Sequence, residues 1–128
     1  MDARQHLYYA FGILAYAIAK ADGEVQPEER ERLQDLIYKE TGHEPDFDYA
    51  EIIFNLLCRD GQPLSSATGW AMEAFEKGKH QLGPMLQQRF LFMLKAIAKA
   101  HPPITPSEQA IISNFYQWLE ELPANPNA

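Results

Sequence analysis

The sequence lacks several features on which whole classes of proteins depend. It holds one cysteine, Cys58, so an intramolecular disulfide is excluded. No apolar run approaches the roughly 18 residues that a membrane-spanning helix needs, and the first residues lead into an amphipathic helix instead of a signal sequence. We therefore expect a cytoplasmic protein with no membrane insertion. A lone cysteine in an apolar segment is usually buried and inert, and we expect this of Cys58.

The residue sets that carry catalysis are missing as well. The sequence shows no glycine-rich loop that would cradle a phosphate and no Ser/His/Asp or Cys/His set. His6, His43 and His80 are scattered without metal-ligand spacing, so we expect them at the surface. These observations predict a protein without enzymatic activity.

Basic residues are too few in the first half of the chain to balance its acidic residues. The net charge of −7 comes from residues 1–64, whereas residues 65–128 are balanced. A field of this sign repels phosphate backbones, so we expect no binding to nucleic acid. The acidic half would attract cations or the basic surfaces of other proteins. Other proteins are therefore the expected partners, and neither their identity nor the oligomeric state follows from the sequence.

Prolines and glycines divide the chain into helical segments. Apolar residues recur at helical spacing, as at Leu7, Phe11 and Leu14, and no segment alternates with the period of two that a strand needs. The predicted helices cover residues 2–21, 27–41, 47–59, 65–80, 84–100 and 106–122. We therefore predict an all-α protein, a compact bundle of about six or seven helices. Residues 1–122 form a single domain, and residues 123–128 form a flexible tail.

A short string occurs twice in the chain. Residues 17–21 and residues 96–100 both read AIAKA. The match continues at the same offset in the pairs Val25–Ile104, Pro27–Pro106, Glu29–Glu108 and Leu33–Ile112. Internal repeats define architecture, so we expect a duplicated helix–turn–helix unit related by a pseudo-two-fold axis.

The turn after the first copy is rich in carboxylates. Asp22 follows the first helix, Glu24 lies in the turn, and Glu29 lies in the first turn of the next helix. Helix C-termini expose carbonyl oxygens and a partial negative charge, which disfavours a carboxylate unless a cation compensates. If the second helix folds back, these oxygens converge, and oxygen ligands suit calcium or magnesium. We therefore predict a weak divalent-cation site at Asp22, Glu24 and Glu29, and no other cofactor.

The same residues also have structural explanations. Glu29 stands at the position from which a glutamate closes a capping box, and Asp22 would stabilise a turn. The second copy favours this explanation, because Thr105 and Glu108 form a capping-box string where no ligand is needed. His101 takes the place of Asp22 there, and a histidine suits a helix C-terminus without a metal. His101 would act as a ligand only if the pseudo-axis brought both turns together.

Two stretches of the chain resemble the TerB-like domain of tellurite-resistance proteins. These are Phe11–Leu36, with the strings AKADGEV and PEE, and Leu94–Leu119. The resemblance implies an all-helical, pseudo-symmetric fold without enzymatic activity. It also implies a role in tellurite and chemical stress responses, and it maps the acidic turn of the family onto the three predicted ligands. The chain departs from the pattern at residues 101–103, His-Pro-Pro, where a second acidic turn would be expected.

Two functions therefore stay open. The first is a cation-responsive binding module at the acidic turn. The second is a metal-independent protein–protein adaptor, in which the acidic half is the docking face and the turn is structural. Four aromatic residues bear on the second function, since they would form either a partner-binding patch or, more commonly, part of the core: Trp70, Phe75, Tyr116 and Trp118.

Overall fold

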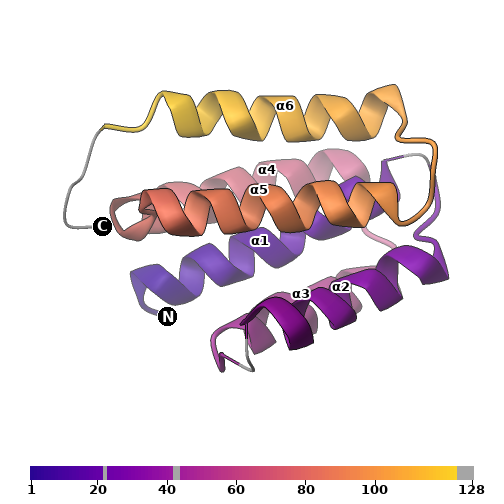
Figure 1. The fold of residues 1–128 in the computed structure, drawn as a ribbon, viewed down its shortest axis with the longest axis horizontal. Coiled ribbons are helices and arrows are strands. Elements are labelled where there is room, and N and C mark those ends of the chain that lie inside the picture. The colour runs from indigo at the N-terminus through magenta and orange to yellow at the C-terminus, as the bar shows by residue number, and fades with distance from the viewer. Residues whose placement is uncertain (22, 42–43, 124–128) are drawn as a thin grey trace.

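The computed structural model describes residues 1–21, 23–41 and 44–123, and its regular elements are all helical (Figure 1). In chain order they are α1 (Ala3–Lys20), α2 (Pro27–Thr41), α3 (Phe47–Asp60), α4 (Leu64–Gly78), the short 3₁₀ helix η1 (Lys79–Gln81), α5 (Pro84–Lys99) and α6 (Pro106–Glu120). The predicted all-α class is thus confirmed, and each predicted helix is present close to its predicted bounds. From residue 124 onward, the predicted tail lies outside the described residues.

The centre of the bundle is α1, which contacts every other helix. Every residue from Ala10 to Ala19 is buried, as expected for a helix that is apolar on all sides. In Figure 1, α2 and α3 lie on one side of α1 and α6 lies on the other. Within the described residues, no helix combines the length and the apolar character that crossing a membrane requires.

Two glycines let helices approach α1 closely. A Cβ at Gly12 would overlap the backbone oxygen of Ala50 in α3. A Cβ at Gly78 would overlap the backbone oxygen of Ala3 at the start of α1. Gly78 also ends α4, which is shorter than predicted because the chain tightens into η1 over the next three residues.

Aromatic rings connect the helices around α1. The ring of Phe90 in α5 stacks on Phe11 of α1 at a centroid distance of 4.8 Å and meets the edge of Tyr8 at 5.8 Å. Phe75 of α4 joins the cluster at 6.2 Å from Phe90 and lies 4.8 Å from Phe115 of α6. Such pairs add specific ring contacts to the burial of apolar area, so this cluster holds four helices together.

One face of α3 is more exposed than the sequence predicts. Ile53 and Leu57 face the core, whereas Ile52 is 64% exposed and Leu56 is 39% exposed. Cys58 is half-buried instead of buried. The reason is that α3 packs on α1 along one stripe only, so the apolar residues between the core positions point to solvent.

Candidate functional site

The α1–α2 turn reverses the chain between two packed helices. The Gly23 amide donates to the Lys20 carbonyl at 2.9 Å, and Gly23 has a φ of +117°, a backbone conformation that favours glycine. The first helix itself ends at Lys20, with Ala21 as its C-cap. Glu24 follows on the exposed side of the turn, and Val25 packs partly against the core.

A buried glutamate stands at the start of the helix after each turn. Glu29 is 0% exposed, and its Oε1 accepts a hydrogen bond from the Gln26 amide at 3.1 Å. Glu108 is 1% exposed, and its Oε1 accepts from the Thr105 amide at 2.9 Å, while the Thr105 hydroxyl accepts from the Glu108 amide at 3.2 Å. Glu29 therefore makes the contact of a capping residue. A duplicated unit would produce this repeat, although the duplication itself stays a prediction.

The α1–α2 and α5–α6 turns lie together at one end of the bundle (Figure 1). His101 Nδ1 lies 3.6 Å from Glu28 Oε2, which makes an ion pair when the histidine is protonated. The two turns thus meet, and this was the condition under which the sequence allowed His101 a role as a ligand.

The three predicted ligands do not share one environment. Asp22 lies outside the described residues. Glu24 is exposed, whereas Glu29 is buried under the turn. Among the residues that the structure describes, no three His, Cys, Asp or Glu side chains gather so that they could hold a metal ion. A cation site that includes Asp22 therefore stays a prediction.

Tyr16 and Cys58 lie near the same acidic turn. The Tyr16 hydroxyl donates to the Gln62 carbonyl at 2.7 Å. Burial raises the pKa of Tyr16, and the nearby Cys58 and Glu24 raise it further. Burial also raises the pKa of the Cys58 thiol and outweighs the lowering effect of Arg30. A raised pKa disfavours the reactive thiolate, so the inertness expected of Cys58 stays a prediction.

A polar cluster at the other end of the bundle was not anticipated. Glu44 Oε1 accepts hydrogen bonds from Arg4 Nη2 at 2.7 Å and from the Tyr8 hydroxyl at 2.9 Å, and Arg89 Nη1 lies 3.6 Å from Glu44 Oε2. Burial acts to raise the pKa of Glu44, but the hydrogen bonds from Arg4 and Tyr8 outweigh it, so the pKa is lowered. Only the one-turn spacing of Arg4 and Tyr8 is visible in the sequence, because Glu44 and Arg89 are distant in the chain.

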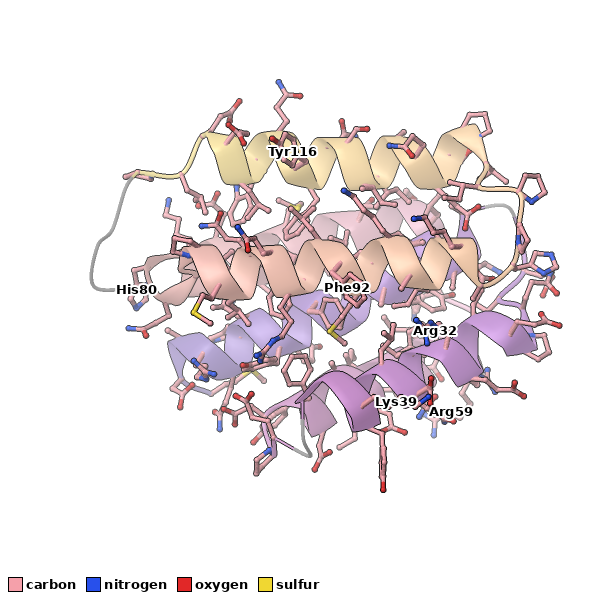
Figure 2. All side chains as sticks on the ribbon, in the orientation of Figure 1. Arg32, Lys39, Arg59, His80, Phe92 and Tyr116 are labelled. Atoms are coloured by element: carbon pink, nitrogen blue, oxygen red, sulfur yellow. The ribbon has the colours of Figure 1, made fainter. Side chains whose placement is uncertain are left out.

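A charged groove between α2 and α5 was also missed. Its volume is about 330 Å³, and it is lined by Arg32, Phe92, Lys95, Ala96, Lys99 and Ala100. Figure 2 shows Phe92 on α5 and Arg32 on α2 on the same face of the molecule. Phe92 is 53% exposed. The available signal was the spacing of Phe92, Lys95 and Lys99, which places all three on one face of a helix.

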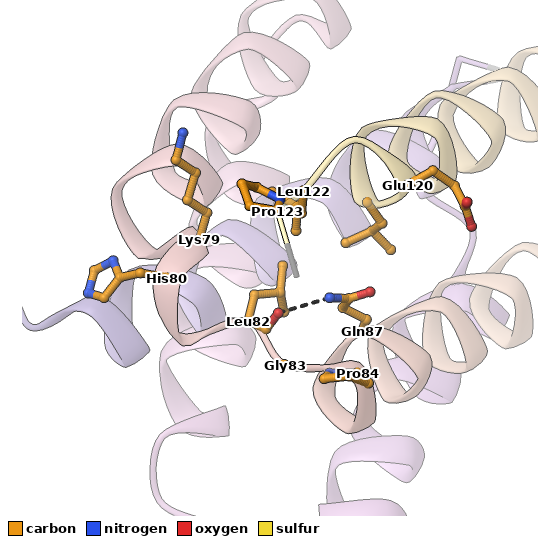
Figure 3. A pocket seen from close by; sticks show the side chains of 10 residues that line it. Lys79, His80, Leu82, Gly83, Pro84, Gln87, Glu120, Leu122 and Pro123 are labelled. Atoms are coloured by element: carbon orange, nitrogen blue, oxygen red, sulfur yellow. Dashed lines mark hydrogen bonds between the residues drawn. The ribbon is translucent and has the colours of Figure 1, made fainter. Parts of the chain in front are cut away.

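Another groove, of about 370 Å³, lies where the end of α6 meets η1 and α5 (Figure 3). In its wall, Gln87 Nε2 donates to the Leu82 carbonyl at 2.9 Å, which satisfies a carbonyl just before α5. His80, at the start of the segment that leads into α5, is one of the residues that line the groove. Lys79 and Glu120 contribute the charges of its lining, and the rest is mainly apolar. This groove lies along a seam between helix ends.

The four aromatic residues considered as a patch divide between core and surface. Phe75 is fully buried. Trp118 is half-buried, and its indole Nε1 donates to Glu76 Oε1 at 2.9 Å. Trp70 and Tyr116 are 43% and 51% exposed. Core packing therefore accounts for Phe75 and fixes Trp118, whereas Trp70 and Tyr116 are accessible to a partner.

Comparison with known protein families decides what this helical arrangement is. A family model described as "Tellurite resistance protein TerB" matches residues 9–122. The chain belongs to the TerB family. The match spans α2 to α6 and most of α1, which confirms the resemblance seen in Phe11–Leu36 and Leu94–Leu119. The TerB family is not a known enzyme family. No curated protein and no solved structure matches the chain.

Proposed function

We propose that this TerB domain acts without catalysis, as a metal-independent adaptor that binds other proteins in the tellurite and chemical stress response. The observation that carries this proposal is that the carboxylates near the acidic turn differ in burial. Glu29 is buried in a capping contact, whereas Glu24, Glu28 and Glu31 are exposed around the start of α2. We call these three exposed residues the acidic face.

The acidic face suits a basic partner surface. It concentrates part of the molecule's net charge of −7 in one place, so it raises the rate of encounter with positively charged proteins. Helix N-termini also tolerate carboxylates, so these residues do not destabilise α2. The acidic face therefore provides recognition charge at no structural cost.

The adaptor proposal is tested by affinity capture from cells with a tagged chain. We expect the same specific partner to be retained with and without a metal chelator, because no ion is needed. Replacing the acidic face with glutamines (Glu24→Gln, Glu28→Gln and Glu31→Gln together) should abolish retention. A control with the same change of charge at exposed positions elsewhere, Asp48→Asn, Glu73→Gln and Glu121→Gln, should retain the partner. Loss of the partner in chelator, or equal retention by both variants, contradicts the adaptor.

A weak calcium or magnesium site at Asp22, Glu24 and Glu29 is the second candidate. Its support is the exposed Glu24 beside the C-terminal carbonyls of α1, where a cation would be favoured. Glu29 would have to exchange its bond to the Gln26 amide for the ion. If the site binds calcium, ten times its dissociation constant should add about 1.4 kcal/mol of stability and raise the melting midpoint by a few degrees. A midpoint that calcium leaves unchanged in both the wild type and Asp22→Asn removes this candidate.

A further inference from the structure

The groove between α2 and α5 continues into a second hollow. The hollow has a volume of about 480 Å³ and is lined by Glu28, Glu31, Arg32, Asp35 and Ala100. Arg32 and Ala100 line both spaces, so the two adjoin along the seam of α2 and α5, and we treat them together as the groove. The seam joins helices that pack directly on each other.

The two walls of this groove carry opposite charge. On the α5 wall, Lys95 and Lys99 are exposed, and no carboxylate among the described residues lies within ion-pair distance of either. On the α2 wall, Glu31 is exposed and has no cation partner within the described part of the chain. Asp35 on the same wall is shared between Arg32 at 3.1 Å and Lys39 at 3.2 Å. The unsatisfied charges are therefore positive on α5 and negative on α2.

A groove with two oppositely charged walls restricts what fits it. A purely acidic segment would be attracted by Lys95 and Lys99 but repelled by Glu28 and Glu31, and a purely basic segment would meet the reverse. The fitting partner presents positive charge to α2 and negative charge to α5. A second copy of the same groove has this arrangement, because a two-fold axis along the groove exchanges its walls, and such isologous contacts are the commonest in oligomers.

We propose that two copies of the chain associate through this groove, with Lys95 and Lys99 of each copy facing Glu28 and Glu31 of the other. The inference rests on the proposed function, because it assigns one partner to residues of the acidic face. The half-exposed ring of Phe92 becomes covered by α2 of the second copy, which adds apolar burial to the charge pairs. Each copy carries −7, so association is strongest where salt screens this long-range repulsion but leaves contact pairs largely intact.

The test is sedimentation of the full chain at increasing concentration and about physiological ionic strength. The wild type should move from a mass of 14.6 kDa toward twice that value. Lys95→Glu with Lys99→Glu should sediment as a monomer, and so should Glu28→Lys with Glu31→Lys. An equimolar mixture of these two variants should recover the dimer, because each wall then meets a wall of opposite charge. Recovery also shows that both variants are folded.

A matched control separates groove charges from general charge effects. Lys77→Glu reverses an exposed lysine on α4, outside the groove, and should leave dimerisation unchanged, whereas Lys99→Glu should weaken it at least tenfold. A wild type that stays monomeric, a dimer that tolerates Lys99→Glu, or a mixture that does not associate overturns the proposal. A monomeric chain that still captures another protein through its acidic face overturns the dimer alone and leaves the adaptor function standing.

Discussion

At the scale of single residues, two glutamates show what sequence reasoning can and cannot reach. The capping role of Glu29 was predictable because its partner, the Gln26 amide, is three residues away and follows a known local pattern. The role of Glu44 was not, since its partners Arg4, Tyr8 and Arg89 come from α1 and α5. Local hydrogen bonds follow from spacing, whereas long-range ones follow only from the packing of helices.

The Glu44 cluster leads to a pH prediction. The pKa of the Glu44 carboxyl group is lower in the folded protein than its usual value of 4.5. The ionised carboxylate therefore stabilises the fold fully at pH values above 4.5. The stabilisation is lost as the pH falls through the lower folded pKa. Thermal midpoints of the wild type and Glu44→Gln should therefore differ at pH 7 and converge as the pH drops below about 4. Midpoints that stay equally far apart at pH 7 and pH 3 would contradict this assignment.

At the scale of helices, the spacing of apolar residues and the positions of prolines and glycines were sufficient to place the helices along the chain. The helical period of 3.6 residues, prolines at helix starts and glycines after helix ends act within one segment, so most helix bounds were predictable. The end of α4 was the exception, because the chain tightens into η1 there. It was harder to predict which face of each helix is buried. Ile52 and Leu56 of α3 are apolar yet exposed, and the groove between α2 and α5 pairs segments about sixty residues apart. Which stripe of a helix is covered depends on neighbours that a single segment does not reveal.

Two glycines inside helices should respond in opposite directions to alanine. Gly12→Ala forces a methyl group against the Ala50 backbone and the Ile53 side chain, so it should destabilise the protein by about 1–3 kcal/mol. A methyl group added by Gly69→Ala meets nothing within 4 Å, because Gly69 is an exposed position of α4, and the change should stabilise the protein by about 0.5–1 kcal/mol through helix propensity. Urea unfolding of both variants measures the two effects. Similar shifts of the same sign would show that the α1–α3 contact is not tight.

At the scale of the whole molecule, the organisation is radial. The central α1 touches each of the other helices, and the aromatic cluster around Phe90 extends from it. The sequence did not indicate this, since the first segment was interpreted as an amphipathic helix, whereas the TerB family was visible in Phe11–Leu36 and Leu94–Leu119. The acidic turn and the repeated helix before it carried the recognisable residues, whereas the middle helices, α3 and α4, showed no recognisable motif.

Radial packing predicts a gradient of protection against hydrogen exchange. Amides of α1 between Ala10 and Ala19 should exchange only when the whole protein unfolds, because releasing them requires every helix contact to open. Amides on the exposed sides of α2 and α6 should exchange earlier, through local opening. Exchange resolved by residue, measured by NMR at low denaturant, checks this order. Stronger protection of the α6 amides than of the α1 amides would contradict this prediction.

The burial of α1 on all sides also has a consequence for biosynthesis. The ribosome synthesises α1 before any of the helices that pack on it. The nascent chain therefore exposes a long apolar segment to solvent until α4, α5 and α6 have emerged. No shorter N-terminal piece can shelter it. Nascent chains should therefore depend on chaperones in the cell. A chain that is truncated after α3 should aggregate and should not form a smaller folded domain.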